Sequence, residues 1–135
     1  MKKFLFVLAV LIAASLALSA CAGGGPSNNI RVTFTDFQFS PNEFTIPAGQ
    51  EITVNATNNG AVEHEFVIFK FGKDAGEKFG DEDEENIFWE VKALPGETKI
   101  ETFTAPTEPG EYYITCGTEG HLEAGMSGSL TVVAP

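Results

Sequence analysis

The sequence is poor in cysteine, histidine, methionine and basic residues. Among its 135 residues there are two cysteines and two histidines. Only one cysteine, Cys116, lies beyond residue 21, so an internal disulfide is excluded in that part of the chain. Eight Lys and Arg side chains stand against nineteen Asp and Glu side chains, which gives a net charge of −11. Because nucleic acids are bound through clusters of basic side chains, this balance argues against nucleic acid as a partner.

Long apolar runs are also scarce. The one present, Phe4–Leu18, follows Lys2 and Lys3 and is shorter than the roughly 20 apolar residues of a membrane-spanning helix. A basic start followed by a short apolar stretch is typical of a secretory leader, so residues 1–20 are predicted to be a signal peptide. The protein is therefore expected to be exported.

Residues 18–21, Leu-Ser-Ala-Cys, resemble the bacterial lipobox. Lipidation of Cys21 after cleavage is predicted to anchor the protein at the outer face of the cytoplasmic membrane, on the extracytoplasmic or periplasmic side. The alternative is cleavage at small residues, with Cys21 free or removed. Residues 21–29 then form a flexible, glycine-rich tether, and residues 30–135 form one domain of ordinary size. Without the leader, six basic residues face nineteen acidic ones, for a net charge of −13.

The region from Ile30 onward consists of short extended runs separated by turn residues. This pattern predicts an antiparallel β-sandwich or barrel. A change of parity after Thr35-Asp36 indicates a bulge or bend, and Asn59-Gly60 is typical of a tight turn. Residues 64–69 are apolar on both faces and are expected to form a central strand. The predicted strands cover residues 30–39 with the bend, 44–46, 51–56, 64–69, 99–104, 111–116 and 127–133.

Residues 72–94 break this rhythm. A connection of that length within a compact domain is usually functional or contains a local helix, so we expect a loop with a short helical turn. It begins polar and carries a run of five acidic residues, Asp81, Glu82, Asp83, Glu84 and Glu85. This run has two interpretations: a merely solvated loop, or a docking surface that steers a basic redox partner.

The scarce residues themselves form a pattern. Taken singly, Cys116 would be a small buried hydrophobe, Met126 a gap filler, and His64 or His121 an ordinary polar residue. Together they include every histidine of the chain and every cysteine and methionine beyond residue 21. Two imidazoles and a thiolate in a trigonal arrangement, with a weak axial thioether, favour a copper ion that cycles between Cu(I) and Cu(II).

The spacing of these residues requires a folded loop at a strand end. Each five-residue step, from Cys116 to His121 and on to Met126, spans about 17 Å when extended, so convergence on one ion requires the loop to fold back. Gly117, Gly120 and Gly125 permit the backbone angles and close approaches that such folding needs. His64 joins the others only if its strand begins at the edge of the sandwich where the strand of Cys116 ends.

The run from Cys116 to Met126, with its C-x4-H-x4-M spacing, resembles the copper loop of small blue copper proteins, the cupredoxin family, and is closest to the auracyanin-like pattern. The resemblance implies a Greek-key β-sandwich of seven or eight strands and one type 1 copper. It carries the ligand roles onto His64, Cys116, His121 and Met126. It also implies that His121 reaches solvent through an apolar patch as the electron port, flanked by Leu122. The sequence departs from the family at Glu65, where many members have Asn.

A complete ligand set leaves no open position for substrate, so the predicted function is outer-sphere electron transfer between redox partners, and not enzymatic catalysis. A copper reductase or oxidase needs further histidines, and a dinuclear copper carrier needs a second cysteine near Cys116, where Gly120 occupies the plausible place. A thiol hydrolase built on Cys116 and His121 lacks an orienting third group. The alternative that remains is an extracytoplasmic lipoprotein that binds and delivers copper. The sequence names neither the electron donor nor the acceptor.

Overall fold

The structure is a computed structural model, and it describes residues 25–135. The predicted signal peptide and Cys21 lie outside the described residues. Within residues 25–135, no helix is both long and apolar enough to cross a membrane.

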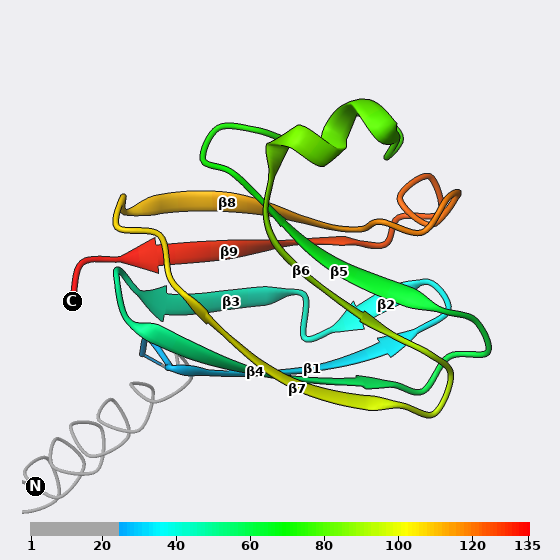
Figure 1. The fold of residues 1–135 in the computed structure, drawn as a ribbon, viewed down its shortest axis with the longest axis horizontal. Helices are drawn as coiled ribbons and strands as arrows, with labels where there is room; N and C mark the ends of the chain where they lie inside the picture. The colour runs from blue at the N-terminus through cyan, green and yellow to red at the C-terminus, as the bar shows by residue number, and fades with distance from the viewer. Residues whose placement is uncertain (1–24) are drawn as a thin grey trace, which may run out of the picture.

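The described residues form two packed β-sheets (Figure 1). The first sheet has the order β2-β1-β4-β7, with strands β2 (Gln38–Ser40), β1 (Asn29–Thr35), β4 (Glu51–Asn58) and β7 (Thr98–Thr104). The second has the order β3-β9-β8-β5-β6, with strands β3 (Glu43–Pro47), β9 (Ser127–Val133), β8 (Gly110–Cys116), β5 (His64–Phe69) and β6 (Ile87–Ala93). The all-β sandwich predicted from the sequence is confirmed, with nine strands in the described part where seven or eight were expected.

Two strand pairs differ from the antiparallel arrangement that the sequence pattern predicts. Strand β1 pairs with β4 in parallel, and β3 pairs with β9 in parallel, whereas the other pairs are antiparallel. The chain passes from the first sheet to the second between β2 and β3 and returns before β4. Such crossings let two strands of one sheet run in the same direction, which a direct hairpin does not.

Phenylalanine rings from both sheets fill the core. The Phe66 ring of β5 contacts Phe34 of β1, Phe39 of β2 and Phe44 of β3, with centroid distances of 6.2, 5.1 and 5.7 Å. All four side chains are buried. Offset and edge-to-face contacts of this kind are favourable beyond the apolar area that they bury. They join the end of β1 to the beginning of β5, where the candidate site lies.

The predicted long acidic loop is partly correct. It contains the expected short helix, a 3-10 helix η2 (Asp81–Asn86), but its last part is strand β6. Trp89 of β6 stacks on Phe103 of β7, with ring centroids 4.8 Å apart and planes at 26°. This contact joins the edge strands of the two sheets. The segment is extended because its backbone pairs with β5 in the antiparallel direction, from His64 opposite Ala93 to Ile68 opposite Trp89.

The chain is attached to the sandwich from Ser27 onward. The Ser27 N–H donates to the Thr45 carbonyl at 2.9 Å, and the Asn28 carbonyl accepts from the Thr53 N–H at 2.8 Å. Strand β1 then begins at Asn29. Residues 27–29, which the sequence assigns to the predicted tether, are therefore bonded to the sandwich.

One end of the sandwich gathers the residues of interest. Strand β5 begins there at His64, β8 ends there at Cys116, and β9 begins there after Met126, since β8 is antiparallel to both β5 and β9. Strand β1 ends at the same end, while its first residue lies at the opposite end, as Figure 1 shows. The β8–β9 loop, drawn in orange, projects beyond the strands at that end.

Candidate metal centre

The structure brings three of the predicted ligands together at the end of the second sheet. The Cys116 Sγ atom lies 3.3 Å from the His121 Nδ1 atom and 3.8 Å from the His64 Nδ1 atom. The two Nδ1 atoms are 3.1 Å apart. All three residues are buried, and His121 is the most exposed of them, with 7% of its surface accessible to solvent. His64 is fifty-two positions upstream of Cys116, and it joins the group because strands β5 and β8 are antiparallel neighbours with Phe66 opposite Cys116.

Met126 is fixed in the same loop. Its backbone N–H donates to the His121 carbonyl at 3.0 Å, and its carbonyl accepts from the Cys116 N–H at 3.0 Å. Its side chain is fully buried within the core. The backbone of the predicted axial ligand is therefore tied to two of the other predicted ligands.

The β8–β9 loop folds back in the way that the spacing requires. Gly120 and Gly125 have φ angles of 81° and 94°, a region where side-chain-bearing residues are strained. The His121 N–H donates to the Thr118 carbonyl at 3.1 Å. Gly117 has a different role, because a Cβ atom there would lie 2.3 Å from the Glu65 Oε2 atom. Two of the three loop glycines thus provide positive φ, and the third permits a close approach.

The donor set fits a soft transition-metal ion. In a plane around one ion, with bonds of about 2.0 Å to nitrogen and about 2.3 Å to sulfur, the donor atoms would be separated by roughly 3.5–3.7 Å. The observed edges of 3.1, 3.3 and 3.8 Å are close to this triangle. Two nitrogens and one sulfur in a buried pocket are the donors that select copper over hard cations.

The protonation of these groups also suits a metal. Burial is the main cause that lowers the pKa of His121, and the neighbouring His64 adds to it, so the imidazole stays neutral with a free lone pair. Burial raises the pKa of the Cys116 thiol, although the Glu65 N–H, which lies 3.4 Å from the Sγ atom, acts in the opposite direction. A metal must therefore displace the thiol proton on binding.

Asp36, in the β1–β2 turn, is a site residue that the sequence analysis missed. Its Oδ1 atom lies 2.7 Å from the His64 Nε2 atom, and its Oδ2 atom accepts from the Ala61 N–H at 2.9 Å. The Ala61 hydrogen bond and then that of His64 hold the pKa of this carboxyl below its ordinary value. The change of parity after Thr35-Asp36 signalled a bend, but nothing in the sequence places that bend beside His64.

The next residue of the same turn covers the second histidine. The Phe37 ring meets the His121 ring edge-on, with centroids 4.8 Å apart and an angle of 69°. Phe37 is 44% exposed, whereas His121 and Leu122 are nearly buried. The expected apolar surface beside His121 is therefore provided by Phe37, and Leu122 contributes little to it.

Glu63 and Glu65, which flank His64, are both held in place. The Glu63 carbonyl accepts from the Thr118 hydroxyl at 3.2 Å, which links it to the β8–β9 loop. The carboxylates of both residues approach the Lys92 ammonium group, at 3.3 Å for Glu63 and 3.9 Å for Glu65. The position where many family members have Asn is thus filled by an acidic side chain with a basic neighbour on β6.

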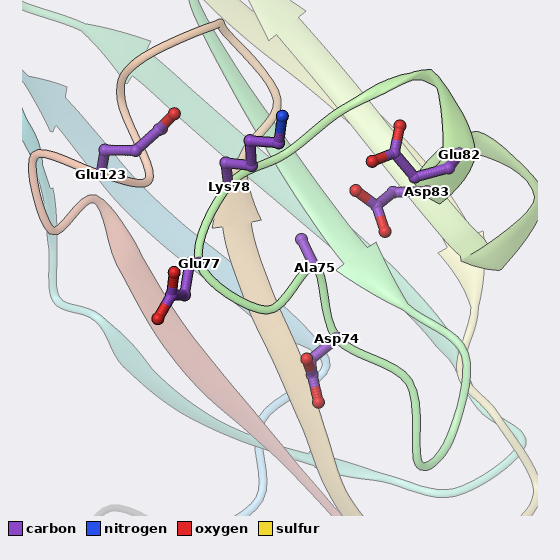
Figure 2. Close-up of a pocket in the computed structure, with 7 residues that line it drawn as sticks. All are labelled: Asp74, Ala75, Glu77, Lys78, Glu82, Asp83 and Glu123. Carbon is purple, nitrogen blue, oxygen red and sulfur yellow. The ribbon is translucent and has the colours of Figure 1, made fainter.

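A shallow acidic hollow lies beside the β8–β9 loop, residues 117–126, which we call the metal-binding loop (Figure 2). Figure 2 shows Glu123 of the β8–β9 loop across from Lys78, with Glu82 and Asp83 farther along the same hollow. A neighbouring hollow joins Glu82 and Glu84 to Gly117, Glu119 and Glu123 of the loop. Of the predicted docking residues, Asp83 is buried and accepts a hydrogen bond from the Gly80 N–H at 3.0 Å. The other four, Asp81, Glu82, Glu84 and Glu85, are exposed.

Comparison with known proteins agrees with a β-sandwich that holds a copper site. The model of the cupredoxin-like domain family matches residues 7–132. The chain is 33% identical to auracyanin-A of Chloroflexus aurantiacus, covering 95% of this chain and 96% of that protein. It is 30% identical to the copper-resistant cuproprotein CopI of Rubrivivax gelatinosus over 76% of this chain and 65% of that protein. Among solved structures, reduced auracyanin from Roseiflexus castenholzii superimposes with a TM-score of 0.70 and 34% identity, covering 81% of this chain and 99% of that one.

Proposed function

Because the chain belongs to the cupredoxin-like domain family, we propose that it is a mononuclear type 1, or blue, copper electron-transfer protein in which His64, Cys116, His121 and Met126 hold the metal. The observation that carries the proposal is the buried triangle of two imidazole nitrogens and one sulfur. When bound, copper supplies a one-electron couple between Cu(I) and Cu(II). The protein is an electron carrier and not an enzyme, like the relative auracyanin-A that it matches over nearly its whole length.

The residues of the chain keep this site rigid and dry. The β5–β8 pairing fixes His64 relative to Cys116, and the backbone bonds of Met126 close the loop that carries His121. A site whose donors do not move between oxidation states needs little rearrangement for each electron. The Glu65 N–H donates to the Cys116 sulfur, and such a bond helps to set the reduction potential.

We place electron entry and exit at His121, through the edge that Phe37 covers. His121 is the only one of the four predicted ligands that retains some exposure. Phe37 offers an apolar contact surface at the same place. A redox partner that contacts Phe37 comes close to the copper site while the site remains buried.

We propose that a partner with a basic surface docks beside this edge. Three exposed carboxylates of η2, those of Asp81, Glu82 and Glu84, line a hollow together with Glu119 and Glu123 of the β8–β9 loop. A cluster of charges of one sign raises the rate of association with an oppositely charged protein. The partner itself, whether donor or acceptor, is defined here only by that chemistry.

We also propose that the protein is exported and anchored through a lipid on Cys21, at the outer face of the cytoplasmic membrane. The motif at residues 18–21, which follows a basic start and a short apolar run, supports this. Mass spectrometry of the membrane fraction tests it, and a diacyl or triacyl mass on a peptide that begins at Cys21 is the expected result. A soluble mature chain that begins elsewhere would contradict the anchor while leaving the copper site unaffected.

A copper-delivery role is the second candidate, and the similarity to a copper-resistant cuproprotein favours it. The two functions share the ligands but differ in how fast copper leaves. Reversible one-electron voltammetry with slow loss of copper supports the carrier. Rapid transfer of copper to a second metal-free copper protein supports delivery instead.

The central test is to add Cu(II) to the purified domain that begins at Gly25. An intense visible band from charge transfer between thiolate and copper is expected, and Cys116→Ser is expected to abolish it while the far-ultraviolet circular dichroism stays unchanged. Met126→Leu serves as the matched control, because it leaves the thiolate and both imidazoles in place. It is expected to retain the band and to shift the reduction potential. A colourless wild-type complex would overturn the proposal.

A further inference from the structure

The His64 imidazole is held from outside the ligand set by one carboxylate. Its Nε2 atom lies 2.7 Å from the Asp36 Oδ1 atom. Its Nδ1 atom is one corner of the donor triangle, with the His121 Nδ1 and Cys116 Sγ atoms as the other two. An imidazole nitrogen that faces a carboxylate at this distance carries the ring proton and donates an N–H hydrogen bond to the carboxylate oxygen. That bond leaves the lone pair of a neutral ring on the other nitrogen. The contact therefore selects the tautomer in which His64 can bind a metal through Nδ1.

The carboxylate is itself fixed. The second oxygen of Asp36 accepts from the Ala61 N–H, in the loop that leads to His64. Gly60 completes the arrangement, because a Cβ atom there would lie 2.3 Å from the Asp36 Oδ1 atom and 2.7 Å from the His64 Nε2 atom. Its φ angle is not among the positive ones, so the reason for glycine here is close approach and not the turn. The protein thus leaves open the space in which the two side chains meet.

Asp36 reaches His64 from the opposite sheet. It follows β1 of the first sheet, whereas His64 begins β5 of the second. The same turn carries Phe37, which packs on His121. The β1–β2 turn therefore contacts both histidines, but only Asp36 bonds to a ligand nitrogen.

We propose, on the basis of the proposed copper function, that Asp36 is a positioning residue that fixes the tautomer and orientation of His64. Its negative charge also favours the oxidised metal ion, Cu(II). An imidazole that donates to a carboxylate is a stronger electron donor, so it stabilises Cu(II) more than Cu(I). Asp36 therefore strengthens Cu(II) binding and lowers the reduction potential. Asp36 acts through His64, because it contacts Nε2, the ring nitrogen that is not part of the donor triangle.

The experiment compares Asp36→Asn and Asp36→Ala with Glu123→Gln. Glu123 is an exposed carboxylate on the metal-binding loop that acts on His121 only through space, so its variant removes one charge near a ligand without removing a hydrogen bond. Asn has the size of Asp, but an NH2 donor replaces one of the two carboxylate oxygens, so in this arrangement either the Ala61 N–H or the His64 Nε2 atom loses its acceptor. We expect both Asp36 variants to weaken Cu(II) binding by about 10- to 100-fold and to raise the potential. Glu123→Gln is expected to change the affinity less than about threefold, in keeping with screened surface charge.

A second measurement requires no copper. In the metal-free protein, the nitrogen-15 shifts of His64 are expected to report a proton on Nε2 in the wild type and a mixture of both tautomers in Asp36→Ala. A wild-type protein that binds no copper would refute the proposed function, and the tautomer measurement would still decide the role of Asp36. Asp36 variants with an unchanged tautomer, or with affinities and potentials equal to those of Glu123→Gln, would overturn the inference.

Discussion

Glu65 contacts the metal-binding loop through both its backbone and its side chain. Its N–H donates to the Cys116 sulfur, and its carbonyl accepts from the Gly117 N–H at 3.3 Å. Its half-buried carboxylate occupies the space that a side chain at position 117 would need. The backbone contacts at this position do not depend on the side chain, which explains how an acidic residue is tolerated where Asn is common in the family.

The Glu65 carboxylate is predicted to make the metal-free domain less stable at neutral pH than a neutral side chain would. Burial is the main cause that raises the pKa of Glu65, and the nearby Lys92 offsets part of it. A group whose pKa is raised on folding contributes stability below its ordinary pKa, near 4.5, and that contribution is lost as the pH rises through the raised value. Glu65→Gln is therefore expected to raise the free energy of unfolding at pH 7.5 and to lose this advantage at pH 3.5, as measured by urea denaturation.

The control for Glu65→Gln is Glu63→Gln. The Glu63 side chain is more exposed and also faces Lys92, so it shares the basic neighbour but lacks the burial. Its variant is expected to change stability little at either pH, since exposed ion pairs contribute little. Equal effects of the two variants would show that Lys92, and not burial, dominates the behaviour of Glu65.

At the scale of strands and loops, the predicted extended runs include every strand of the described residues except β6 of the second sheet. Strands β5, β8 and β9 were found because their apolar runs are clear, and the ligand loop was found because scarce residues stand at regular spacing within it. Strand β6 was missed because its exposed and half-buried positions follow an acidic helix without a turn signal. Asp36 was missed for a different reason: the contact joins two sheets, and no local pattern carries such long-range information.

Strand β6 is predicted to depend on Trp89 for its attachment to the first sheet. Trp89→Ala removes the stacked contact with Phe103 and is expected to lower the free energy of unfolding by about 1–3 kcal/mol, less than for a fully buried aromatic residue. Trp89→Phe retains an aromatic ring and should recover most of the loss. Chemical denaturation followed by circular dichroism measures both. A loss no larger than that of Ile100→Ala, at an exposed position of β7, would contradict the role of the stack.

At the scale of the whole molecule, negative charge is expected to govern encounters. Oxidation of the reduced copper protein by the tris(phenanthroline)cobalt(III) cation should slow as salt is added, and oxidation by the ferricyanide anion should accelerate. Replacing three η2 carboxylates is expected to reduce the cobalt rate at low salt by roughly tenfold. The variant is the triple change Glu82→Gln, Glu84→Gln and Glu85→Gln, and stopped-flow absorbance measures the rate.

The matched control replaces three exposed carboxylates by Gln: Glu51, Glu108 and Glu111. They lie at or next to the beginnings of β4 and β8, and both strands begin at the end of the sandwich opposite the candidate site. Both triple variants have the same net charge, so a difference between them isolates position from total charge. If the two variants slow the cobalt reaction equally, the acidic run is a solvated helix without a docking role.

The direction of β1 determines how far the copper site lies from the beginning of the domain, and so which redox partners can reach it. This strand of seven residues, about 23 Å long, separates the first bonded residues of the chain from the copper-binding end. A molecule held to a bilayer by its leading end would carry its redox centre on the side that faces away from the lipid. A donor embedded flat in the bilayer would then be out of range unless the sandwich tips over, whereas a partner with a domain standing above the lipid surface would meet the site directly.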